Sequence, residues 1–366
     1  MAGRFERKRI GDINLDDPFF DSLKKDYPGS ENSTGFVTWF HKKANEIALV
    51  FEDENGIGAF IKLKPGEAEE IVLQDGTTLP KVDRLKISTI KISERYRNRR
   101  IGEGALGLTL WDWRDLGADE IYVTVFEKHT SLIFLLEKYG FTHVGNNLNG
   151  ERVYIKDRRH LDFSDPFKSF PFISPAVDRA GYIIIEDTFH DNMFPYSELK
   201  NTLQESVGLS VENGLSKIYV GKARNVPYEI GQPVFIYRQH TGNGIKKYKS
   251  CLTSYCIITN IIRAKISGET KIEFDDLMRK IGNKSVYDEA QLRTMYKMNP
   301  NMNVIEMLYY GFFGEGKNVN LDWLRRNGFW PNFDSGIYPT DYTLTRAQFE
   351  QILRKGNVDV ENVIIH

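Results

Sequence analysis

The chain has 366 residues, of which 41% are apolar and 13% aromatic, enough for two ordinary hydrophobic cores. Its 49 basic and 50 acidic residues leave a formal net charge of −1, which disfavours a general nucleic-acid binder because such proteins carry a strong basic excess. No apolar run approaches the roughly 18 residues of a membrane helix, and the first residues lack the apolar segment of a secretion signal. We therefore expect a soluble, cytoplasmic protein without membrane contact.

Cysteine and histidine usage gives no sign of a metal site or a disulfide. Cys251 and Cys256 should lie on opposite faces of one strand because the spacing between them is odd, so a bond between them is not expected. The 7 histidines are scattered and do not cluster with cysteine or paired carboxylates at metal-ligand spacing. No metal is predicted.

The first part of the chain predicts two helices followed by a hairpin. One helix begins at Asp16 or Asp17, is entered through Pro18 and ends before Pro28. A second spans residues 36–45, and two strands then follow over residues 46–64. The turn of this hairpin contains Asn-Gly, which is a common hairpin signal.

Residues 84–106, RLKISTIKISERYRNRRIGEGAL, carry the most informative pattern. Ile90 and Ile92 belong to a β-branched strand, and Gly102 and Gly104 remove side chains where a backbone could approach a ligand closely. A helix follows, and its free N–H groups would favour a phosphate. The stretch therefore indicates a phosphate-binding strand, turn and helix.

Arginines in this turn would reinforce the charge preference, since a pyrophosphate needs several donors at once. They are Arg97, Arg99 and Arg100, beside Arg95. A merely solvated basic run is the alternative interpretation. The three-glycine dinucleotide pattern and the Gly-Lys-Ser/Thr ending of a P-loop are both absent.

Downstream, a helix is predicted by Leu106, Leu110 and Trp113 at helical spacing, and Gly117 ends it before a strand over residues 121–126. A second helix follows at once. The chain then reads EKYGFTHVG from Glu137 to Gly145 and re-enters a sheet.

These two motifs resemble the GNAT superfamily of N-acetyltransferases. Arg97 and Gly102 fit the ends of its acetyl-CoA loop, with Arg100 where the family has its middle glycine, and the register Arg99, Gly102, Gly104 also matches. The resemblance implies an α+β fold with a mixed, splayed sheet and flanking helices. It implies acetyl-CoA contacts from Ile90, Ile92, Arg97, Asn98, Arg99, Arg100, Ile101, Gly102, Glu103, Gly104, Ala105 and His129.

The resemblance leaves the catalytic groups open. The family often protonates the leaving thiolate with a tyrosine just before the Glu-Lys pair, where this chain has Leu136. Tyr139 is a possible substitute, although its place in an apolar stripe favours a core role. His129 stands where the family commonly has an asparagine, and a capping or surface histidine is an equal alternative. Glu127 could be a general base or a solvated strand end.

Past a Pro- and Phe-rich stretch ending near Asp178, the pattern changes to short strands separated by Gly, Pro and Asn. We predict domains at residues 1–178 and 179–366. The second resembles PUA-like β-barrels, including the ASCH group, most of which bind RNA or modified nucleotides. A strand over residues 301–313 and helices over 320–330 and 345–356 are also predicted.

One predicted hairpin in the second domain combines cations with aromatic surface, as RNA contact requires. Its residues are Arg238, Lys246, Lys247, Tyr248 and Lys249. A solvated loop whose lysines protect an edge strand is an equal alternative.

The sequence thus predicts an acetyl-CoA-dependent N-acetyltransferase whose second domain positions the acceptor. The first candidate for the acceptor is RNA or aminoacyl-tRNA, and such an activity would fit a toxin-like role. A non-catalytic CoA-sensing or RNA-binding protein and a protein N-acetyltransferase are the alternatives. The sequence does not predict the oligomeric state.

Overall fold

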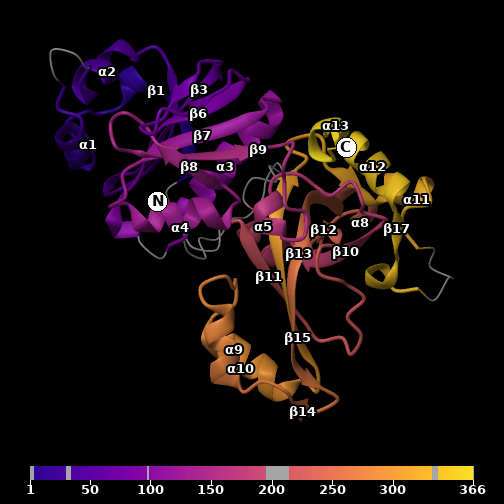
Figure 1. Ribbon diagram of the computed structural model, residues 1–366. Helices are drawn as coiled ribbons and strands as arrows, with labels where there is room; N and C mark the ends of the chain where they lie inside the picture. The colour runs from indigo at the N-terminus through magenta and orange to yellow at the C-terminus, as the bar shows by residue number, and fades with distance from the viewer. Residues whose placement is uncertain (1–3, 30–33, 97–98, 195–213, 332–336, 366) are drawn as a thin grey trace. The chain divides into compact units, whose positions relative to one another are not determined.

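The computed structural model describes residues 4–29, 34–96, 99–194, 214–331 and 337–365. The chain divides into two compact units, Met1–His160 and Leu161–His366 (Figure 1). Residues 161–178 therefore group with the second unit, and the functional division at Asp178 stays a prediction.

The first unit is built on a seven-stranded mixed sheet of order β1-β2-β3-β6-β7-β9-β8, in which only β6 and β7 run parallel. The predicted helices and hairpin are confirmed, whereas β1 and the small β4–β5 hairpin were not predicted. The elements are β1 (Arg4–Arg9), η1 (Ile10–Asp12), η2 (Pro18–Phe20), α1 (Asp21–Asp26), α2 (Phe36–Lys42), β2 (Ile47–Asp53), β3 (Gly56–Glu67), β4 (Ile71–Val72), β5 (Thr78–Leu79), β6 (Arg84–Ile92), η3 (Glu94–Tyr96), α3 (Ile101–Leu116), β7 (Glu120–Val125), α4 (Thr130–Lys138), β8 (Thr142–Asn146) and β9 (Arg152–Asp157).

The strand register assigns the helices to opposite faces of this sheet. Val50, Phe60 and Lys91 are direct neighbours across β2, β3 and β6 and share one face. Val50 and Phe60 pack there with aromatic residues of η2 and α2. Ile92, the next residue after Lys91, lies on the other face, beside Gly102 at the start of α3.

A bulge bends β6 at the point where it leaves β7. On β3, Lys62 and Leu63 pair with Thr89 and Ile87, so Ser88 is the extra residue of β6. The parallel pairing of β6 with β7 covers Arg84–Ile87 only. Beyond it β6 continues to Ile92 on β3 alone, which opens a gap between the two strands. The α+β fold with a mixed sheet is confirmed, and the short pairing of β6 with β7 is the feature that bears on the predicted splaying.

The second unit contains an eight-stranded mixed sheet whose main path is β11-β15-β13-β12-β10-β17, with β14 and β16 paired to β13. The predicted strand near residue 302 is confirmed as β15, and the two predicted helices are present as α11 and α12. The elements are α5 (Pro166–Ser169), β10 (Arg179–Glu186), α6 (Asp187–Met193), β11 (Ser216–Gly221), β12 (Pro233–Gln239), α8 (Lys246–Lys249), β13 (Cys251–Ile266), β14 (Glu269–Thr270), α9 (Phe274–Ile281), α10 (Glu289–Met298), β15 (Met302–Phe312), β16 (Val319–Asn320), α11 (Leu321–Arg326), η6 (Pro339–Asp341), β17 (Leu344–Thr345), α12 (Arg346–Lys355) and α13 (Val360–Val363).

The predicted β-barrel is wrong, because this sheet is open. A barrel needs its two outer strands to pair, yet among the described residues β11 pairs only with β15 and β17 only with β10. The main path places these two strands at opposite ends. Short strands separated by turns indicate a β-rich unit but do not specify closure.

Long strands of the second unit carry a helical lobe that the sequence did not predict. β13 and β15 run side by side to α9, α10 and β14 at the bottom of Figure 1. Phe274 and Leu277 of α9 and Leu292 of α10 pack there against Ile262 and Val304 of the two strands. The lobe therefore has its own small core.

Cys251 and Cys256 are both free and buried, and burial raises the pKa of Cys251 to about 12. Among the described residues, no helix is long and apolar enough to cross a membrane, and no group of three or more His, Cys, Asp or Glu residues could hold a metal ion.

Candidate functional site

The turn into α3 has a left-handed backbone at Arg100, whose φ is 58°. Glycine adopts this region freely, whereas other residues are strained there. Arg100 is the residue that the sequence resemblance aligns with the middle glycine of the GNAT loop. The chain therefore makes the turn that a glycine would favour, but with a side chain attached.

That side chain is held by α3 itself. The Arg100 guanidinium lies 2.7 Å from Oε2 of Glu103, and both side chains are about nine-tenths buried. The Tyr139 hydroxyl donates a 2.9 Å hydrogen bond to Oε1 of the same carboxylate. Arg100, Glu103 and Tyr139 thus form one buried polar network beneath the turn.

The network gives Tyr139 a structural environment. Its side chain has no solvent exposure, and its backbone carbonyl accepts a 2.6 Å hydrogen bond from Nζ of Lys156. Because its hydroxyl already donates to Glu103, we assign Tyr139 a packing role, and its role as a catalytic acid stays an untested prediction.

The N-terminus of α3 lies against the end of β6. A Cβ placed on Gly102 would meet Cδ1 of Ile92 at 3.1 Å and Cδ2 of Leu135 at 3.5 Å. Ile101, Glu103, Gly104 and Ala105 are buried, and the N–H of Gly104 already donates to the carbonyl of Arg100 at 3.1 Å. The first N–H groups of a helix have no partner within the helix and suit an anion.

Other predicted loop residues differ in exposure. Arg99 is exposed, while Ile90 and Ile92 are half-buried at the end of β6 where the gap opens. Arg97 and Asn98 lie outside the described residues. Among the predicted phosphate-binding arginines that the structure describes, Arg99 is therefore the one whose side chain is exposed to solvent.

Two predicted catalytic residues lie at the far end of β7. Glu127 is exposed and ion-paired with Arg152. His129 occupies the N-cap position of α4 without a capping hydrogen bond from its side chain. Partial burial, with a contribution from Lys128, lowers the pKa of His129. Their catalytic roles stay predictions.

The opposite face of the sheet contributes residues that the sequence did not indicate. Nζ of Lys91 donates to Oγ of Ser22 at 2.6 Å, and Lys128 pairs with Asp26 at 2.7 Å. The Tyr27 hydroxyl donates to Oε1 of Glu151 at 2.8 Å. These partners are separated by 69 to 124 positions, so no local pattern could reveal them.

In the second unit, Arg238 is engaged internally. Its guanidinium donates two 2.8 Å hydrogen bonds to the carboxylate of Asp191, which in turn lies 2.9 Å from Nδ1 of His190. Nε2 of the fully buried His190 lies 2.7 Å from Oγ1 of Thr253. Arg238 is thus part of a buried charged network.

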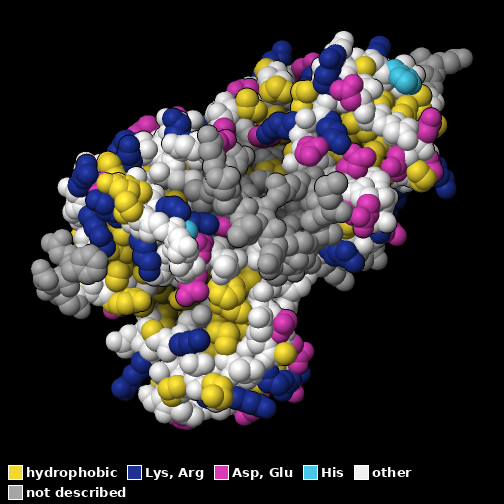
Figure 2. All heavy atoms as spheres, turned by 180° about the vertical axis from the view of Figure 1, so that it is seen from behind, with side chains coloured by type: hydrophobic (Ala, Val, Ile, Leu, Met, Phe, Trp, Pro, Cys, Tyr) yellow, Lys and Arg dark blue, Asp and Glu magenta, His cyan; other side chains and the backbone are white. Residues whose placement is uncertain are grey.

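The predicted lysine cluster forms a short helix, α8, in the connection between β12 and β13. Lys247 pairs with Asp322 at 3.3 Å and lies 4.8 Å from the ring centre of Tyr248, which is 50% exposed. Lys249 donates to the carbonyl of Asn243. Figure 2 shows basic and acidic side chains interspersed on the face that it draws.

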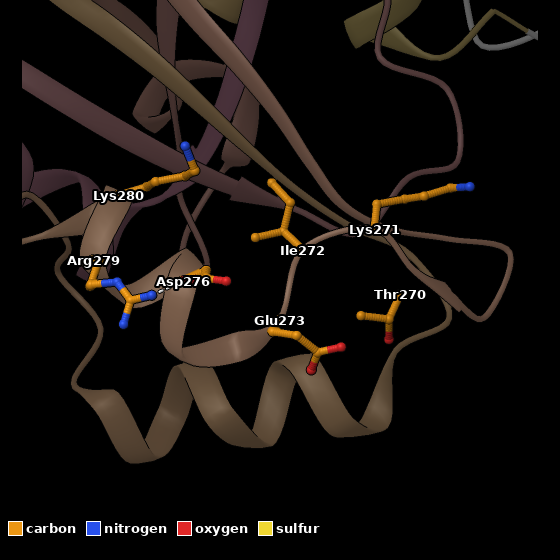
Figure 3. Close-up of a pocket in the computed structure, with 7 residues that line it drawn as sticks. All are labelled: Thr270, Lys271, Ile272, Glu273, Asp276, Arg279 and Lys280. Carbon is orange, nitrogen blue, oxygen red and sulfur yellow. Dashed lines mark hydrogen bonds and ion pairs between the residues drawn. The ribbon is translucent and has the colours of Figure 1, made fainter.

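A surface cavity of about 600 Å³ lies in the helical lobe (Figure 3). Its lining is entirely from the second unit and includes none of the predicted site residues: Thr270, Lys271, Ile272, Glu273, Asp276, Arg279 and Lys280. Arg279 and Asp276 are paired with each other, as the dashed line marks. We assign no role to this cavity.

No family model and no curated protein matches this chain. Solved structures are similar over part of it. Ard1 from Thermoplasma volcanium is 14% identical, covering 42% of this chain and 95% of its own, with a TM-score of 0.29. NAA60 from Arabidopsis thaliana, solved with a bisubstrate analogue, is 13% identical, covering 42% of this chain and 98% of its own, with a TM-score of 0.29.

A GNAT family acetyltransferase from Elizabethkingia anophelis with acetyl-CoA bound is 14% identical, covering 43% of this chain and 98% of its own, with a TM-score of 0.29. These comparisons identify no PUA-like or ASCH domain. At this level of identity they assign no residue role. The chain has a region similar to GNAT acetyltransferases over about 42% of its length.

Proposed function

We propose that the first unit binds acetyl-CoA and transfers its acetyl group to an amine. The observation that carries this proposal is the coincidence of the β6–β7 gap with the start of α3. The strands separate beyond Ile87 and Val123, and Gly102 lies directly beside Ile92 at the end of β6. A strand gap and a helix N-terminus thus adjoin, as a long ligand with a pyrophosphate requires.

The residues present fit acetyl-CoA in two respects. The edge of β6 beyond Ile87, which is not paired with β7, offers backbone groups to an extended amide chain. The exposed Arg99 offers a cation to a pyrophosphate, and the first turn of α3 offers N–H groups. Acetyl-CoA would supply an activated acetyl group, whose C–S bond is replaced by a C–N bond to the amine. The protein's share is to position both and to accept the proton that the amine loses.

Isothermal titration of acetyl-CoA into the full chain tests the proposal. We expect binding in the micromolar range and a loss of about tenfold or more, equivalent to ~1.4 kcal/mol, on Arg99→Glu. Lys42→Glu is the matched control, because it makes the same charge change at an exposed position of α2. Absence of binding by the wild-type chain would contradict both the enzyme and the CoA-sensing alternative and would favour a non-catalytic RNA-binding protein.

A second titration tests the turn geometry. Gly102→Val puts branched carbon atoms against Ile92 and Leu135, so we expect it to displace the N-terminus of α3 from β6 and to weaken acetyl-CoA binding. The circular dichroism spectrum should stay that of a folded protein. Unchanged affinity in a folded Gly102→Val variant would contradict the assignment of this loop.

We further propose that the amine is carried by RNA or aminoacyl-tRNA bound at α8. The support is the pairing of an exposed aromatic ring, Tyr248, with Lys246 and Lys247 in one short helix. Fluorescence anisotropy with labelled tRNA tests it. We expect tRNA binding that weakens as the salt concentration rises and that is weaker in the Tyr248→Ala variant. Lys280→Ala, a substitution in the helical lobe, is the control and should bind tRNA like the wild type. Equal binding by the two variants would point to a protein or small-molecule acceptor.

A further inference from the structure

A buried carboxylate lies on the face of the first sheet opposite α3. Glu151 is 6% exposed and directly precedes β9. It accepts hydrogen bonds from the Tyr27 hydroxyl at 2.8 Å and from Nδ2 of Asn147 at 2.9 Å. Among the ion pairs of the described residues, none includes Glu151, while its neighbours Arg152 and Lys128 pair with other carboxylates. Two neutral donors leave its charge uncompensated, which favours a cation beside it.

Glu151 lies at the strand end where the gap is open. Arg152, the next residue, pairs with Val125 at the end of β7, two residues beyond the last contact of β7 with β6. The Tyr27 ring lies 5.9 Å from that of Phe126, which follows β7 directly. Tyr27 therefore covers the end of β7 and directs its hydroxyl to Glu151.

The α1 segment reaches both sides of this gap. On the β6 side, Lys91 donates to Ser22 at the start of α1. On the β7 side, Lys128 pairs with Asp26, and Tyr27 binds Glu151 just beyond the end of α1. α3 and α4 lie on the other face of the sheet, so we place the acceptor on the α1 side of the gap and acetyl-CoA on the α3 side.

We propose that Glu151, oriented by Tyr27, binds the acceptor as a primary alkylammonium group. The inference rests on the proposed function of the first unit. The ammonium transfers one proton to the carboxylate, and the nitrogen lone pair then forms the C–N bond to the acetyl carbonyl carbon. The C–S bond breaks with its electron pair on sulfur, and the nitrogen passes its second proton to the thiolate, so the products are an acetamide and CoA, with the first proton left on the carboxylate.

Two CoA thioethers test this without knowledge of the natural acceptor. S-(2-aminoethyl)-CoA places an ammonium group close to the sulfur, where the attacking amine must arrive, and S-ethyl-CoA is its neutral match. Titration calorimetry gives the ratio of their affinities for each variant of the full chain. Partial unfolding of a variant lowers its apparent affinity for both thioethers by the same factor, so the ratio of the two affinities is unchanged.

We expect the wild-type chain to prefer S-(2-aminoethyl)-CoA by about tenfold, equivalent to ~1.4 kcal/mol. Glu151→Gln should abolish the preference, Tyr27→Phe should reduce it, and Glu70→Gln, which removes an exposed carboxylate, should leave it intact. Equal affinities of the wild-type chain for the two thioethers would overturn the inference. So would a preference for S-(2-aminoethyl)-CoA that persists in Glu151→Gln, or one that is lost in Glu127→Gln instead. Failure of S-ethyl-CoA to bind would overturn the proposed function itself, and the inference with it.

Discussion

The hydroxyl of Tyr139, at the end of α4, donates a 2.9 Å hydrogen bond to Glu103 in the first turn of α3. It ties the two helices together beneath the turn that we assign to acetyl-CoA. Because Glu103 also holds Arg100, the position of the turn depends on a residue outside the motif that defines it.

Removing this hydroxyl should reduce stability while leaving ligand affinity nearly unchanged. Tyr139→Phe leaves a buried carboxylate oxygen of Glu103 without its donor, and we expect the free energy of unfolding to fall by about 1–2 kcal/mol. Urea unfolding measures this, and titration should show an acetyl-CoA affinity close to that of the wild type. A variant as stable as the wild type, with impaired acetyl transfer, would instead favour an acid role for Tyr139.

Substitutions at Arg100 should separate backbone strain from side-chain pairing. Arg100→Gly and Arg100→Ala both lose the pair with Glu103, but only glycine adopts a φ of 58° without strain. We expect Arg100→Gly to be the more stable variant by about 1 kcal/mol in urea unfolding. Arg99→Ala serves as control and should unfold like the wild type. Equal stability of the two Arg100 variants would contradict a left-handed turn.

The stability of the second unit should fall at acid pH because of His190. Complete burial lowers the pKa of His190, although neighbouring Asp191 opposes the shift. The unfolded chain therefore binds a proton that the folded chain does not, and stability is lost as pH falls below the unfolded pKa of about 6.5. The slope from this residue is at most about 1.4 kcal/mol per pH unit.

His190→Asn tests this by difference. We expect the gap in free energy of unfolding between wild type and variant to narrow as the pH falls from about 7 to 5, because only the wild type must exclude a proton from this position. Asp187, Asp191 and Arg238 surround it in both proteins, so their contributions largely cancel. A constant gap across this range would show that His190 does not titrate on unfolding.

Arg238 should prove structural rather than RNA-binding. Its side chain is 12% exposed and bound to Asp191, so Arg238→Ala removes the guanidinium from a buried carboxylate and leaves it beside His190. We expect a loss of about 3–5 kcal/mol in urea unfolding. Lys246→Ala, at the start of α8, should change stability little. A stable Arg238→Ala variant with weakened tRNA binding would restore the sequence-based assignment.

The candidate site divides into a part that was predictable and a part that was not. The turn at residues 97–105 could be recognised because strand, turn and helix are contiguous and each has a local signal. Glu151 and Tyr27 could not, because their contact joins segments 124 positions apart. Tyr139 was predictable as a core residue, yet its bond to Glu103 depends on how α3 and α4 cross.

Most helices and strands, the hairpin turn and the order of elements in the first unit could be predicted from the sequence, because they follow from spacing, propensity and capping over a few residues. Three features could not: the second sheet is open, Arg100 turns inward to Glu103, and Arg238 is paired with Asp191. Each of these depends on which strands become neighbours and which charges share a buried space. Such long-range pairings minimise uncompensated buried charge and unpaired backbone over the whole fold, and no local pattern encodes them.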